Sequence, residues 1–147
     1  IDLLPTITAL TGGNLPERKI DGKNILDVLT GKTTESPHEA YYFYYNVNDL
    51  HSVRYKNWKM YFPHSYRTMD GQEPGKDGFP GEYRMVDLEE PELYNLETDP
   101  EERKNIIEEH PDVVQKINSL ADQKRKELGD ELTGVEGSEN RPLGRVE

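Results

Sequence analysis

The stretch that most constrains this chain is residues 50–68, which read LHSVRYKNWKMYFPHSYRT. Apolar and aromatic residues alternate with polar ones on both sides of Lys56-Asn57, and this period of two is typical of paired strands. Asn57 tolerates the positive φ of a tight turn, and Pro63 ends the second strand because it has no N–H to donate. The sequence therefore predicts a β-hairpin with apolar positions at Val53, Tyr55, Trp58, Met60 and Phe62.

A polar cluster follows the hairpin directly. His64, Tyr66 and Arg67 open a Gly- and Pro-rich segment, residues 64–90, which we expect to be a long loop. An arginine beside a histidine suits the recognition of an oxyanion such as sulfate, phosphate or carboxylate. The same groups also anchor ordinary loops, so the residues alone leave a binding role and a structural role open.

The first 35 residues predict two short amphipathic helices. One covers residues 2–10, with Asp2 as its N-cap and Gly12-Gly13 as its stop, and the other covers residues 24–29. Two such helices cannot form a core alone, and the chain opens on Ile1 rather than Met. We therefore expect this region to be the end of a larger domain and the chain to be a piece of a longer protein.

Four further segments complete the prediction. Five consecutive aromatic residues at 41–45 predict a central strand covered on both faces, although a platform for stacking carbohydrate is a second interpretation. Residues 92–96 predict a last strand. The sequence DPEE at 99–102 predicts a helix start with a capping box. The longest helix is expected at 111–128, ended by Gly129, and residues 131–147 show no periodicity.

Together these elements predict an α+β fold. We expect a small antiparallel β-sheet of about four strands packed against a long C-terminal helix. The predicted regions are residues 1–35, a subdomain at 36–129, and an extended tail at 130–147.

Composition excludes several classes of function. A net charge of -11 argues against binding to a phosphate backbone, so no nucleic-acid partner is expected. The absence of cysteine excludes disulfides, thiolate metal sites and a cysteine nucleophile. No apolar run is long enough to span a membrane, so no membrane partner is expected either. The acidic residues of the long loop lack the spacing of a calcium loop, and Gly75-Lys76 lacks the context of a phosphate loop.

Several motifs, in order, resemble one enzyme family. DLLPT at 2–6, IDG at 20–22 and LDVL at 26–29 resemble the closing segment of the sulfatase catalytic domain. VR at 53–54, WK at 58–59, YFPH at 61–64 and YRT at 66–68 resemble the C-terminal subdomain of arylsulfatases of the arylsulfatase A type. ELYNL at 92–96, DPEE at 99–102 and the tail with Arg141-Pro142 and Gly144-Arg145 are similar to the end of the same family.

The resemblance implies an enzyme of the alkaline-phosphatase-like fold that hydrolyses sulfate esters through a formylglycine hydrate supported by calcium. The Cys/Ser-x-Pro-x-Arg motif that yields formylglycine is absent here. Neither cofactor is therefore expected in this chain, and the chain alone is expected to be inactive. Its implied partners are the N-terminal catalytic domain of the same protein and, through it, a sulfated small molecule or sugar. A periplasmic or secreted location is implied for the parent.

The resemblance also implies a role for the subdomain, which would brace the catalytic domain and lend its loop to the rim of the substrate pocket. No catalytic residue and no metal ligand is expected in this chain. Two alternatives stay open: a non-catalytic module that binds carbohydrate or protein, and a fragment of a related phosphoester hydrolase. The candidate substrate contacts are His64, Tyr66, Arg67, Arg141 and Arg145.

Overall fold

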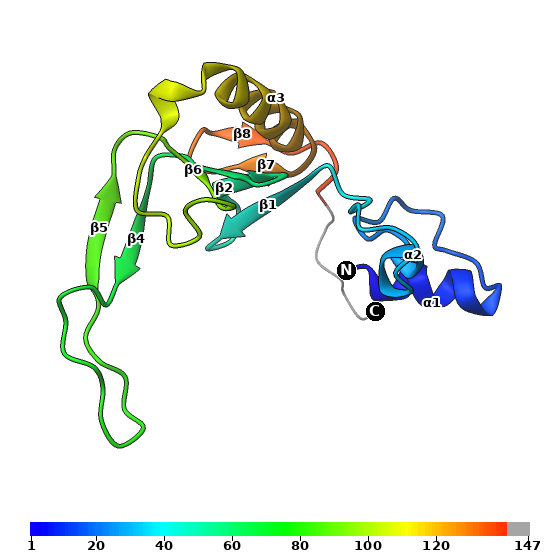
Figure 1. Ribbon diagram of the computed structural model, residues 1–147, viewed down its shortest axis with the longest axis horizontal. Coiled ribbons are helices and arrows are strands. Elements are labelled where there is room, and N and C mark those ends of the chain that lie inside the picture. The colour runs from blue at the N-terminus through cyan, green and yellow to red at the C-terminus, as the bar shows by residue number, and fades with distance from the viewer. Residues whose placement is uncertain (141–147) are drawn as a thin grey trace, which may run out of the picture. The chain divides into compact units, whose positions relative to one another are not determined.

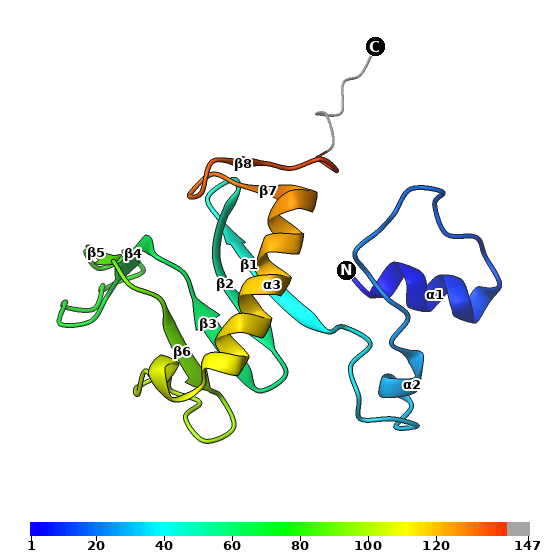
Figure 2. The same cartoon turned by 90° about the horizontal axis from the view of Figure 1, so that it is seen from above.

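The computed structural model describes residues 1–140, which form two compact units, one at Ile1–Glu39 and one that begins at Ala40. Figure 1 labels most of the helices and strands of both, and Figure 2 labels β3 as well. No helix within the described residues has the length and apolar character that crossing a bilayer requires.

The first unit contains the two predicted helices, α1 (Leu3–Thr11) and α2 (Leu26–Leu29). Gly12 ends α1 with a φ of 70°, a left-handed conformation that glycine adopts without steric cost. The second helix begins later than predicted, because the side chain of Asn24 accepts a hydrogen bond from the Leu26 N–H and caps the turn before it. The apolar face of α1 is more than half exposed at Leu3, Leu4, Ile7 and Leu10.

The sequence predicts Asp2 as the N-cap of α1, but the Asp2 side chain makes no capping hydrogen bond. It instead links segments of the first unit that are far apart in the sequence. Its Oδ1 lies 2.8 Å from the backbone nitrogen of Lys23 and 2.8 Å from Nε2 of His38. The chain passes so close to itself that a Cβ on Gly22 would lie 2.0 Å from the carbonyl oxygen of Ile1. A glycine is therefore required at that position.

The second unit is built on a four-stranded antiparallel sheet with the strand order β1-β2-β3-β6. The predicted hairpin is confirmed, since Tyr55 pairs with Trp58 and only Lys56 and Asn57 lie between them. The positive φ of the turn falls on Lys56 (53°) and not on Asn57. The strands are β1 (Ala40–Tyr45), β2 (Asp49–Tyr55), β3 (Trp58–Tyr61) and β6 (Glu92–Asn95).

The long helix α3 (Pro111–Leu128) has the predicted bounds and lies across one face of this sheet, as Figures 1 and 2 show. Its apolar stripe provides Ile117 and Ala121, both fully buried. Packing a helix stripe on a sheet face produces the single hydrophobic core that the predicted α+β fold requires. The buried core comprises Leu50, Val53, Met60, Phe62, Leu93, Ile117 and Ala121.

The predicted central strand is wrong in its position, because β1 lies at one edge of the sheet and pairs, within residues 1–140, with β2 alone. Tyr42 and Tyr44 pack against the core, whereas the alternate side chains of Tyr41, Phe43 and Tyr45 are 43–52% exposed. A run of aromatic residues is compatible with a strand that has one covered face and with a strand that has two. The sequence alone does not distinguish these two cases.

The predicted loop at 64–90 is also wrong. Its two ends form a two-stranded antiparallel ribbon of β4 (His64–Thr68) and β5 (Arg84–Leu88), and only residues 69–83 form the loop at its tip. Figure 1 shows this ribbon extending away from the four-stranded sheet. The two strands lack an apolar alternation because the ribbon is largely solvated, so the period that indicates a strand is missing.

The predicted helix start at 99–102 is a turn. Asp99 accepts hydrogen bonds from the backbone N–H groups of Arg103 and Lys104, but Glu102 has a φ of 55° and breaks the helical course. Its carboxylate instead contacts Lys59 at 2.8 Å and the hydroxyl of Tyr61 at 2.6 Å. A short 3₁₀ helix (Ile107–Glu109) then leads into α3.

The beginning of the predicted tail folds back on the subdomain. Two short strands, β7 (Gly129–Asp130) and β8 (Val135–Glu136), pair beside the end of α3. Asp130 is fully buried there. Its Oδ2 lies 2.8 Å from Nε of Arg125, and its Oδ1 accepts hydrogen bonds from the backbone N–H groups of Leu50 and Leu132.

We expect Asp130→Ala to lower the free energy of unfolding by about 3–5 kcal/mol, because it removes the buried partner of Arg125 and leaves the buried N–H of Leu50 without its acceptor. Asp122→Ala is the matched control, since Asp122 pairs with the same Arg125 but is 65% exposed. Its loss should cost at most about 1 kcal/mol. Urea unfolding followed by circular dichroism measures both values, and equal losses would contradict the role assigned to Asp130.

The first unit should loosen at acid pH. Burial raises the pKa of Asp2, but its hydrogen bonds from Lys23 and His38 outweigh this effect and hold the pKa below its ordinary value of 3.8. The carboxylate therefore stabilises the folded unit above about pH 3.8, and this contribution is lost as the pH falls further. We expect Asp2→Asn to remove this pH dependence and Asp27→Asn, at an exposed carboxylate of the same unit, to retain it. Exchange of the Lys23 amide hydrogen measures both.

Candidate functional site

The candidate site lies where the ribbon joins the sheet. The backbone N–H of Phe62 donates to the carbonyl of His51 (2.9 Å), Pro63 breaks the ladder, and His64 then starts β4 opposite Leu88. The side chains at this point come from β1, β2, β3 and β4, and we refer to them as the junction cluster. Its members are Tyr45, His51, Tyr61, His64, Tyr66 and Arg67.

His64 is at the centre of the junction cluster. Its ring stacks on that of His51, with centroids 3.9 Å apart and planes 28° from parallel. The rings of Tyr61 and Tyr66 flank it at 6.1 Å and 5.7 Å. Its Nδ1 lies 2.6 Å from the carbonyl oxygen of Phe62, so the orientation of the ring is fixed by a hydrogen bond as well as by stacking.

Arg67 reaches the same cluster through Tyr45. Its guanidinium donates to the Tyr45 hydroxyl (3.3 Å) and lies 5.3 Å from the ring centroid of Tyr83. The Tyr45 ring in turn lies 5.3 Å from the ring of His51. The structure therefore brings the predicted residues His64 and Arg67 into one cluster, although they lie on a ribbon rather than on the predicted loop.

Burial and neighbouring charge alter the ionisation of two cluster members. Burial, followed by the nearby His64, lowers the pKa of His51 below its ordinary value, and Asp49 and Asp130 oppose this only in part. Burial raises the pKa of Tyr61, and its hydrogen bond to the Glu102 carboxylate raises it further. Tyr61 is therefore a protonated hydrogen-bond donor throughout the physiological range.

Three members of the junction cluster, Tyr45, His51 and Tyr61, are not among the contacts predicted from the sequence. Tyr45 belongs to the predicted aromatic run at 41–45, and His51 and Tyr61 belong to the stretch that predicts the hairpin. The signal that places His51 is the register of the hairpin. Because Tyr55 pairs with Trp58 and Ser52 with Tyr61, His51 must lie opposite Phe62, two residues before His64.

The other predicted contacts, Arg141 and Arg145, lie outside the described residues. Within residues 1–140, no three histidine, aspartate or glutamate side chains converge as a metal site requires.

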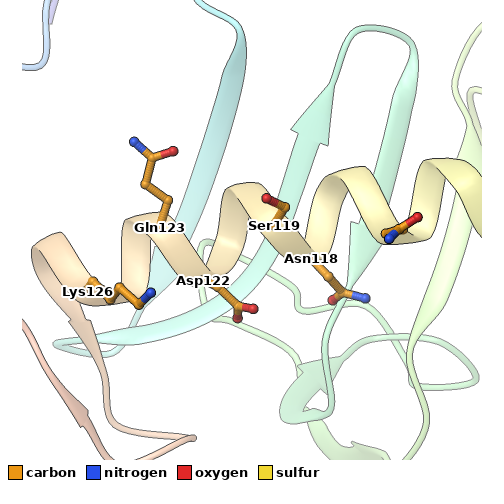
Figure 3. A pocket seen from close by; sticks show the side chains of 6 residues that line it. Asn118, Ser119, Asp122, Gln123 and Lys126 are labelled. Carbon is orange, nitrogen blue, oxygen red and sulfur yellow. The ribbon is translucent and has the colours of Figure 1, made fainter.

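Apart from the junction cluster, a shallow hollow lies along the outer face of α3. Figure 3 shows Asn118, Ser119, Asp122, Gln123 and Lys126 projecting from this helix, and Gln115 also lines the hollow. All six residues belong to α3, so no second element encloses a ligand there. This polar surface is the solvated side of an amphipathic helix.

Comparison with known proteins places this geometry in a family. Residues 36–142 match the family described as the C-terminal region of aryl-sulfatase. Human arylsulfatase A is 31% identical over 133 residues, which cover 82% of this chain and 25% of that protein. Mouse steryl-sulfatase is 29% identical over 141 residues, which cover 87% of this chain and 22% of that protein.

A solved structure agrees with the sequence comparison. A protein of glycosaminoglycan metabolism from Bacteroides thetaiotaomicron superposes with a TM-score of 0.61 and 25% identity over 85% of this chain and 24% of its own. The chain thus spans about a quarter of the length of the proteins it matches. The family match covers most of the chain. The fold of this chain has the predicted α+β architecture. This chain therefore belongs to the family formed by the C-terminal region of aryl-sulfatases.

Proposed function

We propose that this chain is the C-terminal part of an enzyme that hydrolyses sulfate esters, that it braces the catalytic domain, and that its ribbon contributes to the rim of the substrate pocket. The observation that carries the proposal is the junction cluster. There His64, stacked on His51 at the base of the projecting ribbon, is linked through Tyr45 to Arg67, which lies further along β4 opposite Met85. Membership of the aryl-sulfatase family supplies the reaction class.

The cluster suits binding of a sulfated ligand rather than bond cleavage. A guanidinium donates two parallel hydrogen bonds to an oxyanion, which matches the geometry of a sulfate group. Tyr45 holds Arg67 from one side and Tyr83 stacks against it from another, so less side-chain entropy is lost on binding. His64 and Tyr66 add polar edges that we assign to the sulfate or to the organic part of the substrate.

The bracing role is supported by apolar surface that this chain leaves exposed. The α1 face with Leu3, Ile7 and Leu10 is more than half exposed, and so is Tyr45 at the edge of the sheet. Exposed apolar patches of this kind mark interaction surfaces. We assign the α1 face to packing within the catalytic domain, whose closing segment it resembles, and the exposed edge of the sheet to the contact through which the subdomain braces that domain.

The chemical step belongs to the parent protein. Formylglycine, when present as its hydrate, supplies the nucleophile that attacks sulfur, and calcium supports it. The chain contains no cysteine and no Cys/Ser-x-Pro-x-Arg motif, and its described residues form no cluster fit for a metal. We therefore place both groups in the catalytic domain, and no step of the reaction is assigned to residues of this chain.

The first test compares this chain with the parent enzyme matured to contain formylglycine. With an aryl sulfate and a sulfated sugar as substrates, we expect turnover by the parent and none by the 147-residue chain. Turnover by the chain alone would contradict the assignment of the chemistry to the parent. A parent that cleaves phosphate esters but no sulfate ester would favour the related phosphoester hydrolase.

The second test concerns the rim. In the parent, we expect Arg67→Ala to raise KM for a sulfated substrate by about tenfold or more, the loss typical of one charged hydrogen-bonding group. Arg84→Ala is the matched control, because Arg84 lies on the same ribbon but its side chain, among residues 1–140, bonds only to the exposed Asp70. Equal effects of the two variants would show that the ribbon contributes general charge and not a specific contact.

A further inference from the structure

The hydrogen bond of His64 identifies which of its nitrogens faces a ligand. A backbone carbonyl only accepts hydrogen bonds, so the Nδ1 that lies 2.6 Å from the carbonyl oxygen of Phe62 carries a proton. In the neutral ring, Nε2 is then the nitrogen with a lone pair. Within residues 1–140, Nε2 makes no hydrogen bond. It is therefore the atom that His64 offers to a ligand.

The plane of this ring is set by the sheet through His51. His51 lies on β2 between Leu50 and Ser52, which are 0% and 2% exposed, so its backbone belongs to the rigid core. Its ring contacts His64 on one side and Tyr45 at 5.3 Å on another. His64, by contrast, lies at the start of a two-stranded ribbon, which is a less stable element than the four-stranded sheet.

We propose that His51 is a positioning residue for His64, and that the stacked pair presents Nε2 of His64 to the ligand only while at least one ring is neutral. Where it concerns activity, the inference rests on the proposed function. Two imidazolium rings 3.9 Å apart repel each other, so a second proton on the pair opposes the stack that orients His64.

The charges around His51 determine the pH range in which the histidine pair takes up its second proton. Asp49 on its own strand and Asp130 on β7 favour its protonation, whereas burial and His64 on β4 oppose it more strongly, and the pKa of His51 is lowered. The remaining titratable groups of the cluster are the hydroxyls of Tyr45 on β1, Tyr61 on β3 and Tyr66 on β4, and the Arg67 cation. The stack should therefore remain intact at neutral pH and open at acid pH.

The direct test is an NMR titration of the histidines in the 147-residue chain. His64→Phe keeps an aromatic ring against His51 but removes the neighbouring cation, so the pKa of His51 should rise toward 6.5. His110→Phe is the control, because the His110 ring packs, tilted by 54°, against Trp58 at the opposite end of β3. Nitrogen chemical shifts should show the proton of neutral His64 on Nδ1. An unchanged pKa of His51, or a proton on Nε2, would overturn the proposal.

The second test uses kinetics of the parent enzyme. His51→Phe keeps the stacking surface, so KM should be retained and the acid limb of the KM profile should move to lower pH. His51→Ala removes the surface, and KM should rise by about two- to tenfold, the range for one lost aromatic pair. If Phe is as harmful as Ala, the positioning role is wrong. An inactive parent would refute the proposed function but leave the NMR result intact.

Discussion

One buried carboxylate connects the elements on which the candidate site depends. Asp130 is fully buried and accepts hydrogen bonds from Leu50 on β2, from Leu132 and from Arg125 on α3. Removing a charge from water costs several kcal/mol, and the three donors around Asp130 together offset this desolvation cost. The pair is therefore a constraint on geometry more than a source of net stability. It fixes the end of the helix and the returning tail against β2.

The same constraint extends to the two histidines through Phe62. The guanidinium of Arg125 lies 4.5 Å from the centroid of the Phe62 ring, which is itself part of the buried core. The N–H of Phe62 donates to the carbonyl of His51, and its own carbonyl accepts from Nδ1 of His64. A single core residue thus sets both the backbone of one histidine and the ring of the other. The site is exposed, but its geometry is determined by the interior.

Local patterns predicted the parts of the fold that local interactions determine. The hairpin, the strand β6 and the helix α3 follow from the alternation, turn and stripe within each segment, and they occur where expected. The ribbon was missed because β4 pairs with a strand beyond a Gly-rich tip and neither strand has a buried face. The turn at Asp99 carries the sequence of a capping box, but the side chain of Glu102 bonds to β3 instead. For the site, the sequence grouped His64 with Arg67, whereas His51 joins them only through the register of the sheet.

The distribution of charge within the ribbon bears on the site proposed for a sulfated ligand. The tip, residues 69–83, carries Asp70, Glu73, Asp77 and Glu82 against the single cation Lys76, and the whole chain has a net charge of -11. At physiological ionic strength such charges are screened beyond about 8 Å, so they do not prevent an anion from approaching the base of the ribbon. The donor at short range is the guanidinium of Arg67, which Tyr45 holds toward the junction cluster. The tip carries net negative charge and the junction cluster carries the Arg67 cation, so the proposed contact with a sulfated substrate is assigned to the junction cluster and not to the tip.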